Sequence, residues 1–276
     1  MLRILTPITF TQGDISGLNM AFHIAKHQPC HITLLNCIPD VIDRQNNKSH
    51  NLNLTQLNNR LSQYESLSRK RNIENPFELI IDSRLELGYP EEVIPEIARK
   101  EAYNLVIMTS DCSENEMKEV TGSITNDVLK KIDVPLLVIP SHYRMEGEKI
   151  TDILFSIDLT HREYTALHQL ITIMVDCGSK IHCIQFTNRK PTEEEITTLN
   201  ELKHYLTQTN RGASFMMEFL SGEDFYDTIN EYINRENIQI LTLIKKHPSL
   251  LFHWHKSSST SKALYRIKIP LLIINH

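Results

Sequence analysis

Glycine and tryptophan are scarce in this chain, with 8 Gly and 1 Trp among 276 residues. So little glycine excludes collagen-like and low-complexity chains. No apolar run approaches the ~18 residues that a membrane-spanning helix needs, so we expect no membrane partner. The first eight residues read directly as a strand, without a basic segment, a long apolar segment and a cleavage site in succession.

Cysteine is also scarce, and the 5 cysteines form no C-x-x-C pair. An odd, small number of cysteines favours free thiols in a reducing compartment, so we expect a cytoplasmic protein. Positive charge is not in excess either, because 29 Lys and Arg face 34 Asp and Glu, which gives a net charge of −5. The chain therefore lacks the electrostatic signature of a nucleic-acid-binding protein.

The chain carries an internal repeat. Residues 122–139 align without gaps with residues 257–274, and both segments end in Pro-Leu-Leu-(Val/Ile)-Ile. Residues 3–11 correspond in the same way to residues 152–160. Such self-similarity predicts a duplicated domain, with one copy at 1–146 and the other at 147–276.

Each copy alternates apolar strand patterns with amphipathic helix patterns. The expected strands lie at 3–10, 31–38, 77–82, 104–109, 135–139, 150–158, 180–186, 213–219, 238–244 and 270–274. The expected helices lie at 15–26, 54–71, 90–100, 123–131, 163–175, 193–207, 223–235 and 258–265. Strict alternation predicts an α/β fold with parallel sheets and helices on both faces.

Three sequence features resemble the universal stress protein family in its tandem two-domain form. They are Gly122-Ser123 followed by the segment 134–139, Gly88-Tyr89-Pro90 before the third helix, and the opening strand at 4–11. The resemblance implies two Rossmann-like domains, each with a five-stranded parallel sheet, that pair through their last strands. The chain would then be an intramolecular pseudo-dimer, which either stays a monomer or dimerises again into a homodimer.

The resemblance also implies where a nucleotide would bind, because some family members bind ATP or AMP. Their motif Gly-x2-Gly-x9-Gly-(Ser/Thr) brings bare backbone and a helix N-terminus to the phosphates. In the first half Thr109 and Cys112 replace two glycines, Gly122 and Ser123 match, and Thr9 replaces an expected Asp. The sequence between Thr109 and Gly122 carries four carboxylates, which should oppose phosphate binding: Asp111, Glu114, Glu116 and Glu119.

The second half shows the opposite pattern. Asp158 occupies the family's Asp position, whereas Ile244, His247 and Ser257 occupy the glycine positions. The candidate nucleotide or anion ligands in the two halves are Asp158, Lys245, Ser257, Ser258, Ser259, Thr109, Gly122 and Ser123. The alternative is that Ser258 and Thr260 only cap a helix and that Asp158 anchors the loop that follows it.

Three nearby histidines, His247, His253 and His255, are the weak candidates for a metal site. Zinc accepts such ligands, but surface imidazoles on a loop are commoner, so we expect no metal. Nor does the sequence contain a nucleophile elbow, an H-E-x-x-H helix or a P-loop.

We therefore expect a non-catalytic stress-response or signalling protein without a cofactor, which acts through unidentified protein partners or a weak ligand. The alternative is an ATP- or AMP-binding protein, weakly hydrolysing or not, that uses mainly its second domain.

Overall fold

The computed structural model describes residues 1–11, 13–38, 58–67, 69–70, 75–110, 124–144, 149–159, 163–174, 179–209, 214–245 and 266–275. In the first half the elements are β1 (Leu2–Pro7), α1 (Asp14–Ala25), β2 (Cys30–Ile38), β3 (Leu79–Leu87), α3 (Pro90–Lys100), β4 (Leu105–Ser110), α4 (Ile124–Lys131) and β5 (Leu136–Pro140). A further helical segment covers residues 58–67.

The second half repeats this order. Its elements are β6 (Asp152–Ile157), α5 (Glu163–Met174), β7 (Lys180–Thr187), α6 (Glu193–Thr209), β8 (Ser214–Ser221), α7 (Phe225–Glu236), β9 (Ile240–Lys245) and β10 (Leu271–Asn275). The predicted helix at 258–265 lies outside the described residues.

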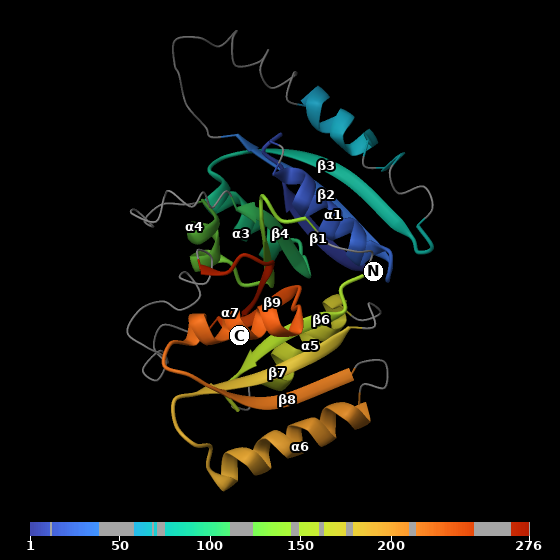
Figure 1. Cartoon of the computed structure of the whole chain (residues 1–276). Coiled ribbons are helices and arrows are strands. Elements are labelled where there is room, and N and C mark those ends of the chain that lie inside the picture. The colour runs from blue at the N-terminus through green and yellow to red at the C-terminus, as the bar shows by residue number, and fades with distance from the viewer. Residues whose placement is uncertain are drawn as a thin grey trace.

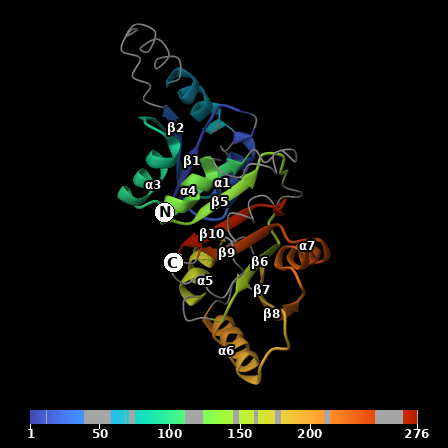
Figure 2. The ribbon, with the colours of Figure 1, turned by 90° about the vertical axis from the view of Figure 1, so that its left-hand side faces the viewer.

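All ten strands form one continuous sheet, in the order β3-β2-β1-β4-β5-β10-β9-β6-β7-β8. Neighbouring strands run parallel except at the centre, where β5 and β10 pair antiparallel with Leu137 opposite Leu272. Figure 1 shows the two halves one above the other, and Figure 2 shows β5 and β10 side by side where the halves meet. The structure confirms the predicted α/β fold, in which two five-stranded parallel sheets join through their last strands.

Apolar residues fill both faces of the sheet. On one face α1 and α5 contribute to a single buried cluster, in which Ile24 and Leu170 are fully buried. On the other face α3, α4 and α7 cover a second cluster that includes Ile94, Val128 and Ile229. Because each cluster takes residues from both halves, burial of apolar surface holds the halves together as well as holding each half folded.

The strand β3 differs from the prediction, which ended it at residue 82. It continues to Leu87 and pairs with β2 over nine residues. Its end was missed because Asp82, Arg84 and Glu86 make that stretch as polar as a loop. These side chains alternate along the strand, as expected of an edge strand that carries charge to prevent pairing with other chains.

In the part of the chain that the structure describes, no helix combines the length and apolar character needed to cross a membrane.

Candidate functional site

In a parallel α/β sheet, ligands bind beyond the carboxyl ends of the strands, where the strand order reverses. Here this place lies beyond β1 and β4 in the first half and beyond β6 and β9 in the second.

The turn that follows the first strand has the same unusual backbone in both halves. Phe10 has φ 60° and Leu159 has φ 56°, in the left-handed region that bulky side chains rarely adopt. These two residues are equivalent in the repeat, and each directly follows the position at which the family carries Asp. The shape of the turn has therefore been kept, although Thr9 stands before it in one half and Asp158 in the other.

Asp14 uses the hydrogen-bond donors of this turn in the first half. The backbone N–H groups of Thr9 and Thr11 donate to its carboxylate at 3.1 and 3.0 Å, and the Thr9 hydroxyl donates at 3.0 Å. The Asp14 residue is only 2% exposed. Burial raises the pKa of its carboxyl, although these hydrogen bonds act in the opposite direction. A buried carboxylate thus occupies donors that an anion would need.

The segment after β5 closes over the start of α1. The Ser16 hydroxyl lies 3.2 Å from the carbonyl oxygen of Ser141 and 3.1 Å from that of Tyr143. The Arg144 guanidinium donates to the same two carbonyls and to the Ser16 hydroxyl. The Arg144 cation near this end of α1 is thereby engaged with protein oxygens.

Thr109, the first-half candidate on β4, packs against α1. Its methyl group would lie 3.2 Å from a Cβ atom placed on Gly17. Thr109 therefore brings a side chain close to the helix at a position where the family's nucleotide motif has bare backbone. Gly122 and Ser123, which complete the predicted first-half set, lie outside the described residues.

Asp158 follows the end of β6 and is half-buried. It has the position relative to the sheet that the resemblance implies. The three serines predicted to join it, Ser257, Ser258 and Ser259, lie outside the described residues.

Lys245 is the last residue of β9, and its ammonium group is engaged with the other half of the molecule. The Nζ atom donates to the carbonyl oxygens of Leu129, Lys130 and Ile132 at 2.6, 3.2 and 3.1 Å. These carbonyls end α4, so Lys245 caps a helix of the first half. Burial lowers the pKa of the ammonium, and the Asp133 carboxylate opposes that shift. No sequence pattern indicates this contact, because the partners are more than a hundred residues apart.

Asp14 was also missed from the sequence. An Asp directly before the apolar stretch at 15–26 is a recognised helix-start signal. That signal would have given Asp14 the wrong role, because Gly13 is the N-cap of α1 and the Asp14 carboxylate accepts from the turn after β1 instead.

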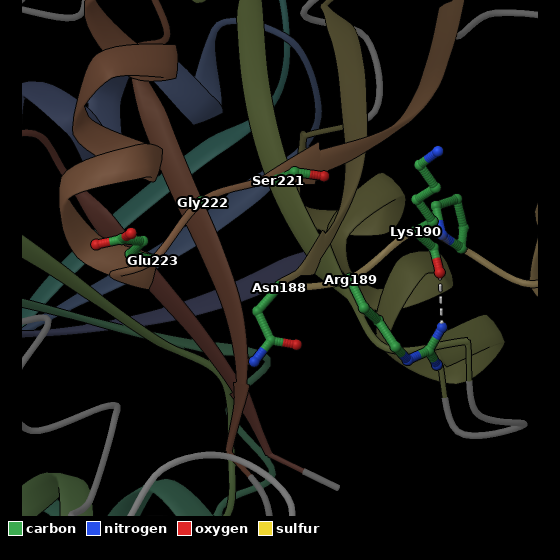
Figure 3. A pocket seen from close by; sticks show the side chains of 7 residues that line it. Asn188, Arg189, Lys190, Ser221, Gly222 and Glu223 are labelled. Carbon is green, nitrogen blue, oxygen red and sulfur yellow. Dashed lines mark hydrogen bonds between the residues drawn. The ribbon is translucent and has the colours of Figure 1, made fainter.

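A pocket of about 680 Å³ lies beyond the ends of β7 and β8. Its lining consists of Asn188, Arg189, Lys190, Pro191, Ser221, Gly222 and Glu223. Figure 3 shows their side chains pointing in different directions rather than toward one centre. The Arg189 guanidinium is held by the Glu195 carboxylate at 2.9 and 2.7 Å, which removes much of the positive charge available to a ligand.

Metal and thiol chemistry find little support in the described residues. No group of three or more His, Cys, Asp or Glu side chains there is placed to hold a metal ion. The candidates His247, His253 and His255 lie outside those residues. Burial raises the pKa of Cys30 and of Cys37 to about 12, so neither thiol is activated.

Comparison with known proteins shows which family the chain resembles. A model of the universal stress protein family matches residues 1–140. A universal stress protein of Methanocaldococcus jannaschii is 31% identical over 87 residues, which cover 30% of this chain and 53% of that protein. The chain thus spans about half the length of this curated relative.

Several solved structures match nearly the whole chain, and two of them illustrate the likeness. A universal stress protein from Archaeoglobus fulgidus superposes with a TM-score of 0.73 at 13% identity, covering 99% of this chain and 96% of that one. A functionally unknown protein from Pseudomonas aeruginosa superposes with a TM-score of 0.57 at 12% identity, covering 99% and 92%. At such identities the likeness shows the fold alone.

Proposed function

Because the chain belongs to the universal stress protein family, we propose that it serves in a stress response as a non-catalytic cytoplasmic protein that acts through protein partners or a weak ligand. Family membership supports the stress-response role. The other parts of the proposal rest on the residues at the carboxyl edge of the sheet.

The Asp14 carboxylate is the observation that carries the proposal. It accepts hydrogen bonds from the backbone N–H groups of Thr9 and Thr11. A phosphate group would compete with this carboxylate for donors and would meet its negative charge at short range. Together with the replacement of two motif glycines by Thr109 and Cys112, this argues against a nucleotide in the first half.

Lys245 supports the same conclusion for the second half. The Lys245 ammonium already donates hydrogen bonds to three carbonyl oxygens of the first half. An ammonium has three donors, so a phosphate could recruit Lys245 only by displacing these contacts. The Lys245 ammonium thus helps to hold the two halves together.

Titration calorimetry with ATP and with AMP tests the proposal. We expect no heat of binding at micromolar ligand, and we expect the native protein to retain protein partners when it is purified by a mild affinity step and its companions are identified by mass spectrometry. Micromolar nucleotide binding that Asp158→Ala abolishes would overturn it. Glu201→Gln, on the exposed surface of α6 in the same half, is the matched control.

The second candidate function is ATP or AMP binding by the second half. Asp158 favours it, since this residue precedes the same left-handed turn as in the first half, with Leu159 at φ 56°. A ligand-bound form would use Asp158 with side chains of the segment that contains Ser258. If calorimetry detects no binding at millimolar nucleotide, this alternative is wrong.

A further inference from the structure

His23 is a buried imidazole on α1 that no part of the proposed function uses. It is 2% exposed, and its Nε2 atom has no hydrogen-bond partner among the described residues. The ring of His27, one helical turn further on, lies 5.1 Å from it between centroids. Burying a polar atom without a partner costs free energy, and burying a charge without a partner costs far more. The surroundings of His23 therefore favour the uncharged ring.

His23 lies in the last turn of α1, and its spacing from Ser16 puts it on the side of the helix toward β5, the strand that borders the other half. Ser16 and His23 are seven residues apart, which places them on one side of the helix. Ser16 bonds to the segment that follows β5, the central strand. Just beyond α1, the Gln28 amide donates to the carbonyl oxygens of Thr172 and Ile173 on α5, at 3.1 and 2.9 Å. We call this contact region of α1 and α5 the seam.

Among the described residues, no acidic group acts on the pKa of His23. The charged groups that act on it are Lys26 and His27, both of the same sign as a protonated imidazole. Of the strands that α1 packs against, β4 and β5 contain no titratable side chain, β1 contains Arg3, and β2 contains Cys30, His31 and Cys37. The central strand β10 contains none either. On α5 the titratable groups are Glu163 in its first turn, Tyr164, and His168, whose ring is 3.2 Å from the Tyr205 hydroxyl.

We propose that the seam is a pH-sensitive joint, closed while His23 is neutral and loosened when its ring takes up a proton. Burial, with smaller contributions from His27 and Lys26, lowers the pKa of His23 to about 4. A histidine exposed to water titrates near 6.5. Between these two values the open seam binds a proton that the closed seam excludes, so falling pH drives opening.

The size of the effect follows from the same two values. Going from pH 7.5 to pH 5 multiplies the opening equilibrium constant by about 30. Opening would release the contacts of Gln28 with α5 and expose apolar residues of the shared cluster, such as Ile173 and Met174.

Hydrogen exchange measured by mass spectrometry at pH 7.5 and pH 5 tests this joint. After correction for the intrinsic effect of pH on exchange, we expect the end of α1 and the end of α5 to exchange about 30-fold faster at pH 5. In His23→Phe, which cannot take up a proton, we expect less than a ~3-fold change. His168→Gln, on the exposed side of α5, is the matched control and should behave as the unchanged chain.

Equal acceleration in His23→Phe and in the unchanged chain would overturn the proposal, as would no acceleration in the unchanged chain. If His23→Phe fails to fold, an NMR titration of the histidine rings in the unchanged chain decides instead. A His23 ring that titrates at 6.5 or above in the folded protein contradicts the joint. The inference concerns the seam alone, so it stands whether or not the chain binds a nucleotide.

Discussion

The Nζ atom of Lys245 lies 2.6 Å from the carbonyl oxygen of Leu129, so a side chain of the second half ends a helix of the first. A second contact of the same kind lies beside it, because the Asn275 amide donates to the carbonyl oxygen of Val134 at 2.7 Å. Both donors stand at the ends of strands next to the antiparallel junction of β5 and β10. The two halves are thus joined by backbone pairing, by shared apolar clusters and by polar contacts to carbonyls at the end of α4 and in the segment between α4 and β5.

Replacing Lys245 by Met should lower the free energy of unfolding by about 1–3 kcal/mol, because the carbonyls at the end of α4 lose a charged donor. Urea unfolding followed by circular dichroism measures this change. Lys130→Met is the control, since Lys130 pairs with Asp127 on the surface and should cost less than about 0.5 kcal/mol. Equal losses in the two variants would show that the cap contributes nothing of its own.

Replacing Gly88 by Ala should also destabilise the fold, by about 2 kcal/mol. Gly88 has φ 132°, and an added Cβ atom would lie 2.7 Å from a methyl group of Val93. Tyr89→Ala changes the next residue, which is 55% exposed, and should alter stability by less than about 0.5 kcal/mol. Thermal unfolding of both variants checks the prediction, and an unchanged melting temperature for Gly88→Ala would contradict it.

Most of the helices and strands could be predicted from the sequence, because its local signals agree with the final packing. The helix at 90–100 was predicted with its observed bounds, since Pro90 followed by Glu91 and Glu92 marks a helix start irrespective of the rest of the chain. The end of β3 was not predicted because charged side chains are expected in a strand only at the edge of a sheet. Which strand lies at the edge depends on the strand order, and no local pattern in the sequence shows that order.

The candidate site depended more on contacts between distant residues. Lys245 stands beside the predicted anion loop in sequence, but its ammonium meets carbonyls of α4, which only the pairing of β5 with β10 brings near. Asp14 reaches the donors of the turn after β1 because Phe10 adopts a left-handed conformation, and no sequence pattern announces that for phenylalanine. The identities of Ser257, Ser258, Ser259, Gly122 and Ser123 as ligands stay predictions.

The buried ring of His182 provides a test of a polar network in the core. Its two nitrogens lie 2.8 Å from the Tyr232 hydroxyl and 2.9 Å from the Asp152 carboxylate. Tyr232→Phe would leave one nitrogen of a fully buried ring without a partner, so we expect a loss of about 1–3 kcal/mol in unfolding free energy. Tyr205→Phe, at a residue 38% exposed, should cost less than about 0.5 kcal/mol. Urea unfolding of both variants measures the two losses, and similar values would contradict this account.

The pH dependence of stability tests the state of Asp14. Its pKa in the folded chain is raised by burial above the ordinary value, so between the two values the folded chain binds more protons than the unfolded chain. The stabilisation from this residue is therefore complete at low pH and is lost as the pH rises through the folded pKa. We compare the unchanged chain with Asp14→Asn, which keeps the shape of the side chain without the charge. The unfolding free energy of the unchanged chain minus that of Asp14→Asn should be smaller at pH 7 than at pH 4, as measured by urea unfolding at each pH. A difference that grows with pH would mean that the hydrogen bonds from Thr9 and Thr11 outweigh burial and favour the charged form. In that case the Asp14 carboxylate would be charged in the folded chain and stabilised by its hydrogen bonds. It would still oppose a phosphate by its negative charge.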